Sequence, residues 1–131
     1  MTLTALHGVE EDRFRQPTGS GAHEWWYFDA IDPASGFALV IIFFRGIPFS
    51  GARQRHRDAP ADEFPAVAFS LYGPRSTDLY LVNLHRSVGI GADRMSITIG
   101  ENRAAYRDGV YVIELNDELL DGRSISARFE F

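Results

Sequence analysis

Apolar and polar residues alternate with a period of two along much of the chain, which is typical of strands with one buried face. Residues 95 to 99 show this clearly, because Met95, Ile97 and Ile99 alternate with a serine and a threonine. The same pattern recurs at the end of the chain. It predicts seven strands, at residues 21–30, 37–44, 67–72, 78–85, 95–99, 110–115 and 124–131.

Short runs of turn-forming residues separate these segments. Asp32–Gly36 and Asp108-Gly109 are hairpin signals, because proline presets φ and glycine accepts a positive φ. No segment has a convincing helical period. The pattern predicts an all-β domain over residues 21–131, either an antiparallel barrel or a half-open barrel or sandwich of about seven to eight strands. Residues 1–20 are predicted to form a polar amino-terminal arm without regular structure.

The predicted strand Phe37 to Phe44 is apolar on both faces. An antiparallel sheet usually has one face in water, so the second face of this strand needs a cover. We expect a second sheet, another copy of the chain in a homo-oligomer, or a second domain missing from this sequence. The chain also stops inside an amphipathic strand, as a shortened chain would. The long connection at residues 45–65 is expected to be a lid or a solvated loop.

Composition excludes several classes of function. The 131 residues include no cysteine, so disulfides and thiolate sites are excluded, and all 13 basic residues are arginine, which excludes a lysine Schiff base. The net charge of -5 argues against nucleic acid as a partner. No secretory signal is recognised in the first twenty residues, and the longest apolar run is too short to span a bilayer. We expect a cytoplasmic protein. The alternative is a protein that also contacts the membrane loosely through an apolar substrate.

The most unusual stretch has four consecutive aromatic residues between two acids. On a strand its two faces would carry Glu24, Trp26 and Phe28, and Trp25, Tyr27 and Asp29. Such large rings belong in a core or along a cavity wall. A carboxyl group kept protonated by apolar neighbours can act as a general acid, and ring faces can stabilise a carbocation. The competing interpretation is that Glu24 and Asp29 pair with Arg45 or cap turns, while the rings fill the core.

Other kinds of site find little support. The histidines at positions 7, 23, 56 and 85 have no ligand spacing with one another or with acids, so no metal is expected. Gly89-Ile90-Gly91 lacks the third glycine and the following helix of a nucleotide-binding loop. No serine is flanked by the glycines of a nucleophile elbow.

Three segments resemble the amino-terminal part of the carotenoid 1,2-hydratase family, also called hydroxyneurosporene synthase. They are His23–Ala30, Ile41–Phe44 leading to Pro48-Phe49-Ser50, and Ser70–Arg75. The order and spacing fit from about Gly19 to the end. The aromatic motif is shared by several branches of this lipocalin-like superfamily, including fungal pericyclases that fold polyenes.

The resemblance implies a lipocalin-like barrel that holds an apolar polyene or other isoprenoid and adds water to a terminal double bond without a cofactor, as a hydro-lyase. Family members have two barrel-like halves, of which this chain would be the first. Carried over residue by residue, Glu24 is the first choice for the general acid, Asp29 the reserve and Tyr27 a proton relay. The implied substrate-binding residues are Trp25, Trp26, Phe28, Phe43, Phe49 and Tyr72. The alternatives are a pericyclase or isomerase acting on a polyene, and a noncatalytic carrier of apolar ligands.

Overall fold

Two antiparallel sheets make up the computed structural model, which describes residues 8–75 and 78–131. The first sheet, sheet A, has the order β1-β2-β3-β4, and the second, sheet B, has the order β5-β6-β7-β8-β9. The strands of sheet A are β1 (Glu24–Asp32), β2 (Phe37–Arg45), β3 (Ala66–Tyr72) and β4 (Leu79–Leu84). Those of sheet B are β5 (Val88–Ile90), β6 (Ser96–Ile99), β7 (Asn102–Arg107), β8 (Val110–Glu118) and β9 (Ser124–Glu130).

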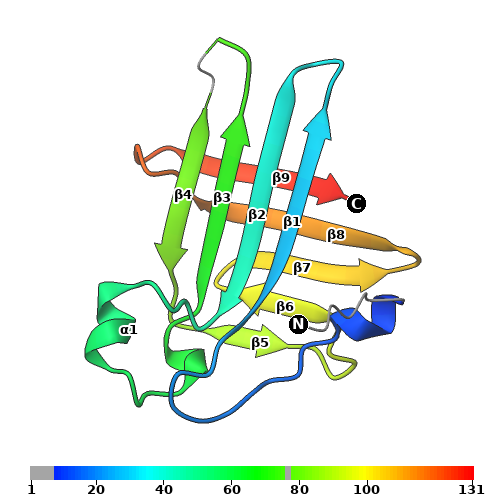
Figure 1. The fold of residues 1–131 in the computed structure, drawn as a ribbon. Helices are drawn as coiled ribbons and strands as arrows, with labels where there is room; N and C mark the ends of the chain where they lie inside the picture. The colour runs from blue at the N-terminus through cyan, green and yellow to red at the C-terminus, as the bar shows by residue number, and fades with distance from the viewer. Residues whose placement is uncertain (1–7, 76–77) are drawn as a thin grey trace, which may run out of the picture.

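The two sheets form two layers whose strands run in clearly different directions (Figure 1). No strand pairing joins one sheet to the other among the described residues, so the sheets do not close into a barrel. The predicted all-β fold is confirmed in its half-open barrel or sandwich form. The lipocalin-like closed barrel implied by the resemblance is not seen.

The core lies between the sheets and is built from alternate residues of each strand. Because side chains on a strand alternate between faces, every second residue of β2 and β3 points to sheet B. The side chains of Ile41, Phe43, Phe69, Ile97 and Ile113 are at most 1% exposed. The apolar residues that alternate along the sequence with a period of two are therefore the residues that form the core.

Both predicted hairpin turns are confirmed. In the first, the Gly36 N–H donates to the Asp32 carbonyl at 2.9 Å, and Gly36 has φ of 77°. In the second, Asp108 and Gly109 have φ of 52° and 88°. Positive φ at both central residues matches the right-handed twist of the paired strands β7 and β8.

The sequence interpretation missed two of the nine strands, β5 and β7. β5 contains Gly89 and has only three residues, so its sequence indicates a turn. β7 places Asn102 and Ala104 in the core, both 0% exposed. An asparagine and an alanine give almost no hydrophobic signal, and the arginines at the strand's outward positions weaken it further.

We expect an amino-terminal arm without regular structure, but part of the arm is ordered. Val9–Asp12 forms a short 3-10 helix, η1, and Phe14 is only 1% exposed. The Phe14 ring lies 4.5 Å from that of Trp26, and the Phe14 N–H donates to the Arg94 carbonyl at 3.0 Å. The arm therefore contributes to the core. The first seven residues of the expected arm lie outside the described residues.

The connection between β2 and β3 contains a short helix, α1 (Gly51–Arg55), and a 3-10 turn, η2 (Ala61–Glu63). The prediction of no helix was wrong here, because Ser50 caps α1 by accepting from the Arg53 N–H at 2.9 Å. Arg53 itself is buried and donates to the carbonyls of Ala22, Ala59 and Pro60.

This connection covers one end of the outer face of sheet A. Ile47 and Phe64 pack there against Phe44 and its neighbours Ile42 and Ala68. Part of the cover expected for the strand at residues 37–44 thus comes from the same chain. The rest of the outer face is apolar and open, with Tyr27, Ile31, Val82 and Leu84 between 50% and 76% exposed. Among the described residues, no helix is long and apolar enough to cross a membrane.

Candidate functional site

A cleft lies along β1, at the side of the molecule where the two sheets are not joined. It has a volume of about 250 Å³. We call it the ring cleft, and it is lined by Asp12, Trp25, Trp26, Tyr27, Phe28 and Tyr111. Because β1 is an edge strand, side chains from both of its faces reach the cleft. Trp26 and Phe28 reach it from the core side, and Trp25 and Tyr27 from the outer face.

The rings of the cleft hold one another in place. Trp26 meets Phe28 edge to face at 6.0 Å and Tyr111 at 5.6 Å, and Phe28 lies 5.4 Å from Tyr111. Such edge-to-face pairs are favourable beyond the area that they bury. The outer wall is freer, since Trp25 and Tyr27 are 47% and 53% exposed. One wall is therefore fixed and the other can adapt.

Asp12 brings a carboxylate into the cleft. Its main-chain carbonyl accepts from Trp26 Nε1 at 2.7 Å, and its Oδ2 accepts a short hydrogen bond from the Tyr111 hydroxyl. Burial raises the pKa of Tyr111 well above its ordinary value, and the hydrogen bond to Asp12 and the Asp12 charge raise it further. Tyr111 therefore stays protonated and donates a hydrogen bond to Asp12.

Sequence reasoning missed both Asp12 and Tyr111. Asp12 ends an acidic run in the segment that is predicted to be a polar arm. Tyr111 lies 99 residues further along the chain, on β8. The available signal was Phe14, the single aromatic residue of the arm, which indicates that this arm packs against the core.

Glu24 lies near the cleft but does not line it. Its carboxylate accepts from the backbone N–H groups of Arg15 and Gln16, and its Oε2 lies 4.0 Å from Arg45 Nη1. Arg45 is itself buried, and its Nε bonds to Asp62 at 2.6 Å. Glu24 thus fastens the arm to the start of β1, in the pairing with Arg45 that the competing interpretation described. Its role as the general acid stays a prediction.

The other predicted site residues fall into two groups. Trp25, Trp26, Tyr27 and Phe28 come together in the ring cleft. Asp29 is exposed on the outer face of β1, and within the described ranges its carboxylate makes no hydrogen bond or ion pair.

Three predicted binding residues do not line the cleft. Phe43 is fully buried beside Trp26 in the core, and Phe49 is 76% exposed just before α1. Tyr72 is 44% exposed at the end of β3, where it packs against Tyr80. The structure therefore places these three side chains, which the resemblance assigned to one binding site, in three different environments.

A second polar cluster joins the sheets on the opposite side of the sandwich. Asp117 of β8 accepts from Asn83 Nδ2 at 2.7 Å and from Asn102 Nδ2 at 2.7 Å, and it lies 2.9 Å from His85 Nε2. Burial alone would raise the pKa of Asp117, but hydrogen bonds from Glu118 N–H, Asn102 and Asn83, together with His85, hold it below its usual value. We interpret this cluster as a structural joint between β4 and sheet B.

No group of histidines and acids within residues 8–75 and 78–131 is arranged to hold a metal ion. The chemistry available at the ring cleft is that of a carboxylate, a protonated phenol and several ring faces.

Comparisons with known proteins give one match. A 30-residue segment is 53% identical to the hydroxyneurosporene dehydrogenase of Chlorobaculum tepidum, and it covers 23% of this chain and 8% of that protein. No family model matches the chain, and no solved structure matches it. The chain is therefore similar, over a short segment, to a protein with a carotenoid-related name.

Proposed function

We propose that this chain binds the end of an acyclic polyene in the ring cleft and adds water to its terminal isoprenoid double bond. The observation that carries the proposal is the ring cleft itself, where four ring-bearing residues of β1 and Tyr111 surround a space that contains the Asp12 carboxylate. The short match to a protein with a carotenoid-related name supports the class of substrate.

The size and lining of the cleft favour part of a long apolar molecule. Small-molecule pockets usually enclose about 300 to 1,000 Å³. The cleft, at about 250 Å³, is slightly smaller and suits the end of a chain. Its open wall consists of Trp25 and Tyr27, which continue into the apolar outer face of sheet A. A longer ligand would extend over that face.

The proposed reaction needs only an acid, a water molecule and a surface that tolerates positive charge. A carboxyl group gives its proton to the less substituted carbon of the terminal double bond, and a tertiary carbocation forms. The faces of Trp26 and Phe28 stabilise this cation electrostatically. Water then adds to the cation and returns a proton to the carboxylate, so the atoms balance without a cofactor.

Among the three acids near the rings, Asp12 is the one that lines the cleft. Tyr111 occupies its Oδ2, so Oδ1 would carry the transferred proton. Glu24 is engaged by two backbone amides and lies near Arg45. Asp29 faces solvent on the outer face of the sheet. We therefore place Asp12 ahead of Glu24 and Asp29 as the proton donor, with the Tyr111 hydroxyl holding its Oδ2. The proton relay through Tyr27 stays a prediction.

The second candidate function is noncatalytic binding of an apolar ligand. The engagement of Glu24 with the arm and Arg45 favours it, because the acid suggested by the resemblance then has a structural role. A pericyclase or isomerase would use the same cleft without adding water.

Product mass separates these functions. The chain is incubated with an acyclic carotenoid dispersed in mild detergent, and the extract is analysed by liquid chromatography and mass spectrometry. A hydratase adds the mass of one water, a dehydrogenase removes two hydrogens, an isomerase changes retention at constant mass, and a carrier leaves the substrate unchanged.

Three variants identify the acid, with Asp108→Asn as the matched control in a turn where asparagine is equally favoured. We expect Asp12→Asn to reduce hydration by about a hundredfold or more, the usual contribution of a general acid. Loss confined to Glu24→Gln or Asp29→Asn would return the role to that residue. Unchanged turnover in all three would remove the proton donor from the proposal.

A further inference from the structure

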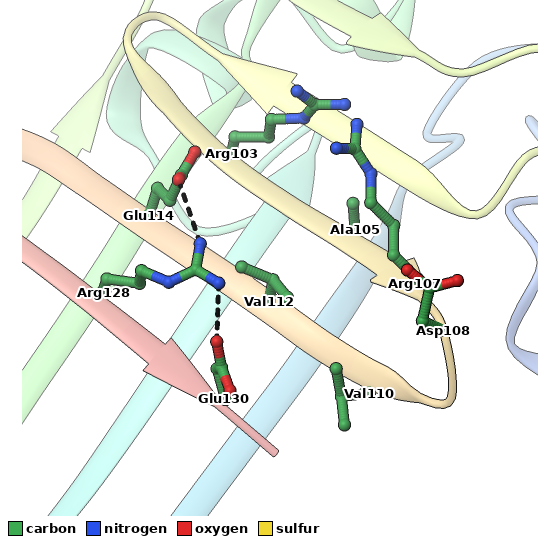
Figure 2. A pocket seen from close by; sticks show the side chains of 9 residues that line it. All are labelled: Arg103, Ala105, Arg107, Asp108, Val110, Val112, Glu114, Arg128 and Glu130. Carbon is green, nitrogen blue, oxygen red and sulfur yellow. Dashed lines mark hydrogen bonds and ion pairs between the residues drawn. The ribbon is translucent and has the colours of Figure 1, made fainter.

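A second pocket lies on the outer face of sheet B, over β7, β8 and β9 (Figure 2). It has a volume of about 260 Å³. We call it the arginine pocket, and it is lined by Arg103, Ala105, Arg107, Asp108, Val110, Val112, Glu114, Arg128 and Glu130. It shares no residue with the ring cleft, so an inference about it does not rest on the proposed function.

The pocket is lined by three arginines and three acids, which differ in whether they are paired. At one side, Arg128 bonds to Glu114 at 3.3 Å and to Glu130 at 2.6 Å, so both of these carboxylates are engaged. The guanidinium groups of Arg103 and Arg107 have no hydrogen bond or ion pair with any described residue, although Asp108 follows Arg107 and Glu114 lies opposite Arg103 on β8. Figure 2 shows the two guanidinium groups reaching toward one another from β7, with Asp108 beside Arg107. These two positive charges therefore have no partner in the described part of the chain.

Arg103 provides the strongest indication of a missing partner. Its Nε is buried and has no acceptor within the described part of the chain. Buried polar groups in folded proteins are nearly always hydrogen-bonded, and leaving one unpaired costs free energy. Glu114 and Glu130 pair with Arg128, so neither of them neutralises these two arginines. An anion bound between the two arginines would accept hydrogen bonds from their terminal Nη atoms and offset the charge that these side chains leave unpaired.

The floor of the pocket between the charged sides is apolar. Ala105, Val112 and Val110 lie there on the outward positions of β7 and β8. A ligand that fits has an anionic head for the two arginines and a short apolar tail for this floor. The planar guanidinium fork matches a carboxylate through two parallel hydrogen bonds. The Glu114 and Glu130 side would repel the same head group, which fixes the direction in which the ligand lies.

We propose that the arginine pocket binds a carboxylic acid with a short apolar tail, with the carboxylate between Arg103 and Arg107. The test is a titration with octanoate. Binding is monitored through the NMR chemical shifts of the Val110 and Val112 methyl groups, and the affinity is measured by calorimetry. Octanol tests the contribution of the charge, and inorganic phosphate tests whether the apolar tail is needed.

Two variants and one matched control make the test specific. We expect Arg103→Gln and Arg107→Gln each to weaken octanoate binding by about tenfold, as expected for losing one charge-assisted hydrogen bond. Arg123→Gln should bind as the unchanged chain does, because Arg123 pairs with Asp121 outside the pocket. Arg103→Lys keeps the charge but loses the fork, so its affinity should fall between those of the unchanged chain and Arg103→Gln.

The proposal is overturned if octanoate fails to shift the valine methyl groups, or if both glutamine variants bind it as the unchanged chain does. Equal binding of octanol would remove the role of the arginines. Equal binding of phosphate would remove the role of the apolar floor. Melting curves of each variant, compared with that of Arg123→Gln, separate lost binding from lost folding.

Discussion

Trp25 and Trp26 are the two tryptophans of the chain, and both line the ring cleft. Intrinsic tryptophan fluorescence therefore reports on this one site. An apolar polyene bound there should quench the emission, and the two residues should contribute differently. Trp26 is 8% exposed and Trp25 is 47% exposed.

We predict that Trp25→Phe retains quenching by an acyclic polyene, because the buried Trp26 remains beside the ligand. Trp26→Phe should lose affinity by about a fewfold to tenfold, since it removes the hydrogen bond from Nε1 to the Asp12 carbonyl and part of the fixed wall. A fluorescence titration of both variants checks this. Equal quenching by a polar dye of similar absorbance would show that the signal does not come from binding in the cleft.

The pKa of Asp117 leads to a prediction about pH. Because this pKa is lowered in the folded chain, the folded state gains stability when the carboxyl is ionised. The gain is present above the unfolded value of about 4 and is lost as the pH falls through the lowered folded value. We predict that Asp117→Asn flattens the loss of stability below about pH 4 and lowers stability at pH 7 by about 1 to 3 kcal/mol.

Urea unfolding at pH 7, pH 4 and pH 3 measures both effects. Asp29→Asn serves as the control, because that carboxylate is exposed and pairs with no described residue. The assignment of Asp117 as a structural joint is wrong if the two variants show the same stability at every pH.

At this scale, sequence alone predicted what depends on alternation. The shared face of Trp26 and Phe28 follows from the period of two, and both are buried in the structure. The partners Asp12, Tyr111 and Asp117 could not be found, because each acts through a contact between segments distant in the chain. No local pattern encodes such a pairing.

The amino-terminal arm is the element whose contribution to the fold was least expected. It is held to the sandwich by Phe14, by the bond from Trp26 to Asp12, and by the bonds from its backbone to Glu24. Phe14 is almost completely buried, so its ring contributes as much as a residue of the core.

We predict that Phe14→Ala lowers the free energy of unfolding by about 3 to 5 kcal/mol, the usual cost of removing a buried phenylalanine. Phe49→Ala, at a position 76% exposed, should change it by no more than about 0.5 kcal/mol. Thermal or urea unfolding measures both. Similar values for the two variants would mean that the arm is not part of the folded core.

The elements differ in how far their sequences define them. β2 and β3 were predicted within one residue at each end, because they are long, apolar and bounded by turn residues. The helix α1 was missed, because it has only five residues and depends on a single serine cap. β7 was missed, because its core positions hold the small Ala104 and the polar Asn102, whose amide is satisfied by the Ile99 carbonyl and Asp117.

The whole molecule has an exposed apolar face on sheet A. The residues of its outer positions include Trp25, Tyr27, Ile31, Tyr72, Tyr80, Val82 and Leu84, all at least 40% exposed. Contiguous apolar patches of this kind usually mark interaction sites. The expectation of a homo-oligomer or a further domain over Phe37 to Phe44 therefore stays a prediction, and it now concerns the part of the face that the connection between β2 and β3 leaves open.

The size of this face suggests a weak dimer. Four strands about 4.8 Å apart and about 23 Å long span about 440 Å², so two copies would bury about 900 Å². This is below the 1,200 Å² or so that stable complexes bury. We predict self-association that is detectable only at high protein concentration and is abolished by Val82→Asp. Sedimentation velocity over a concentration series measures it.

Glu118→Gln is a suitable control for that series, because its side chain is exposed on β8 of the other sheet. A chain that stays monomeric at every concentration, with and without Val82→Asp, would indicate that this face contacts something other than a second copy.

Among the described residues, the two sides of the sandwich are held together in different ways. Asp117 and its partners, together with the bond from Leu120 N–H to the Tyr80 carbonyl, link β4 to the strands of sheet B. On the β1 side, the sheets are bridged by the arm and by side chains alone. A guest molecule entering between the layers would therefore have to displace the arm and would leave every strand pairing intact. The rate at which the guest enters would be set by how often the arm detaches at Phe14. Hydrogen exchange of the Phe14 amide, which donates to the Arg94 carbonyl, would report that opening.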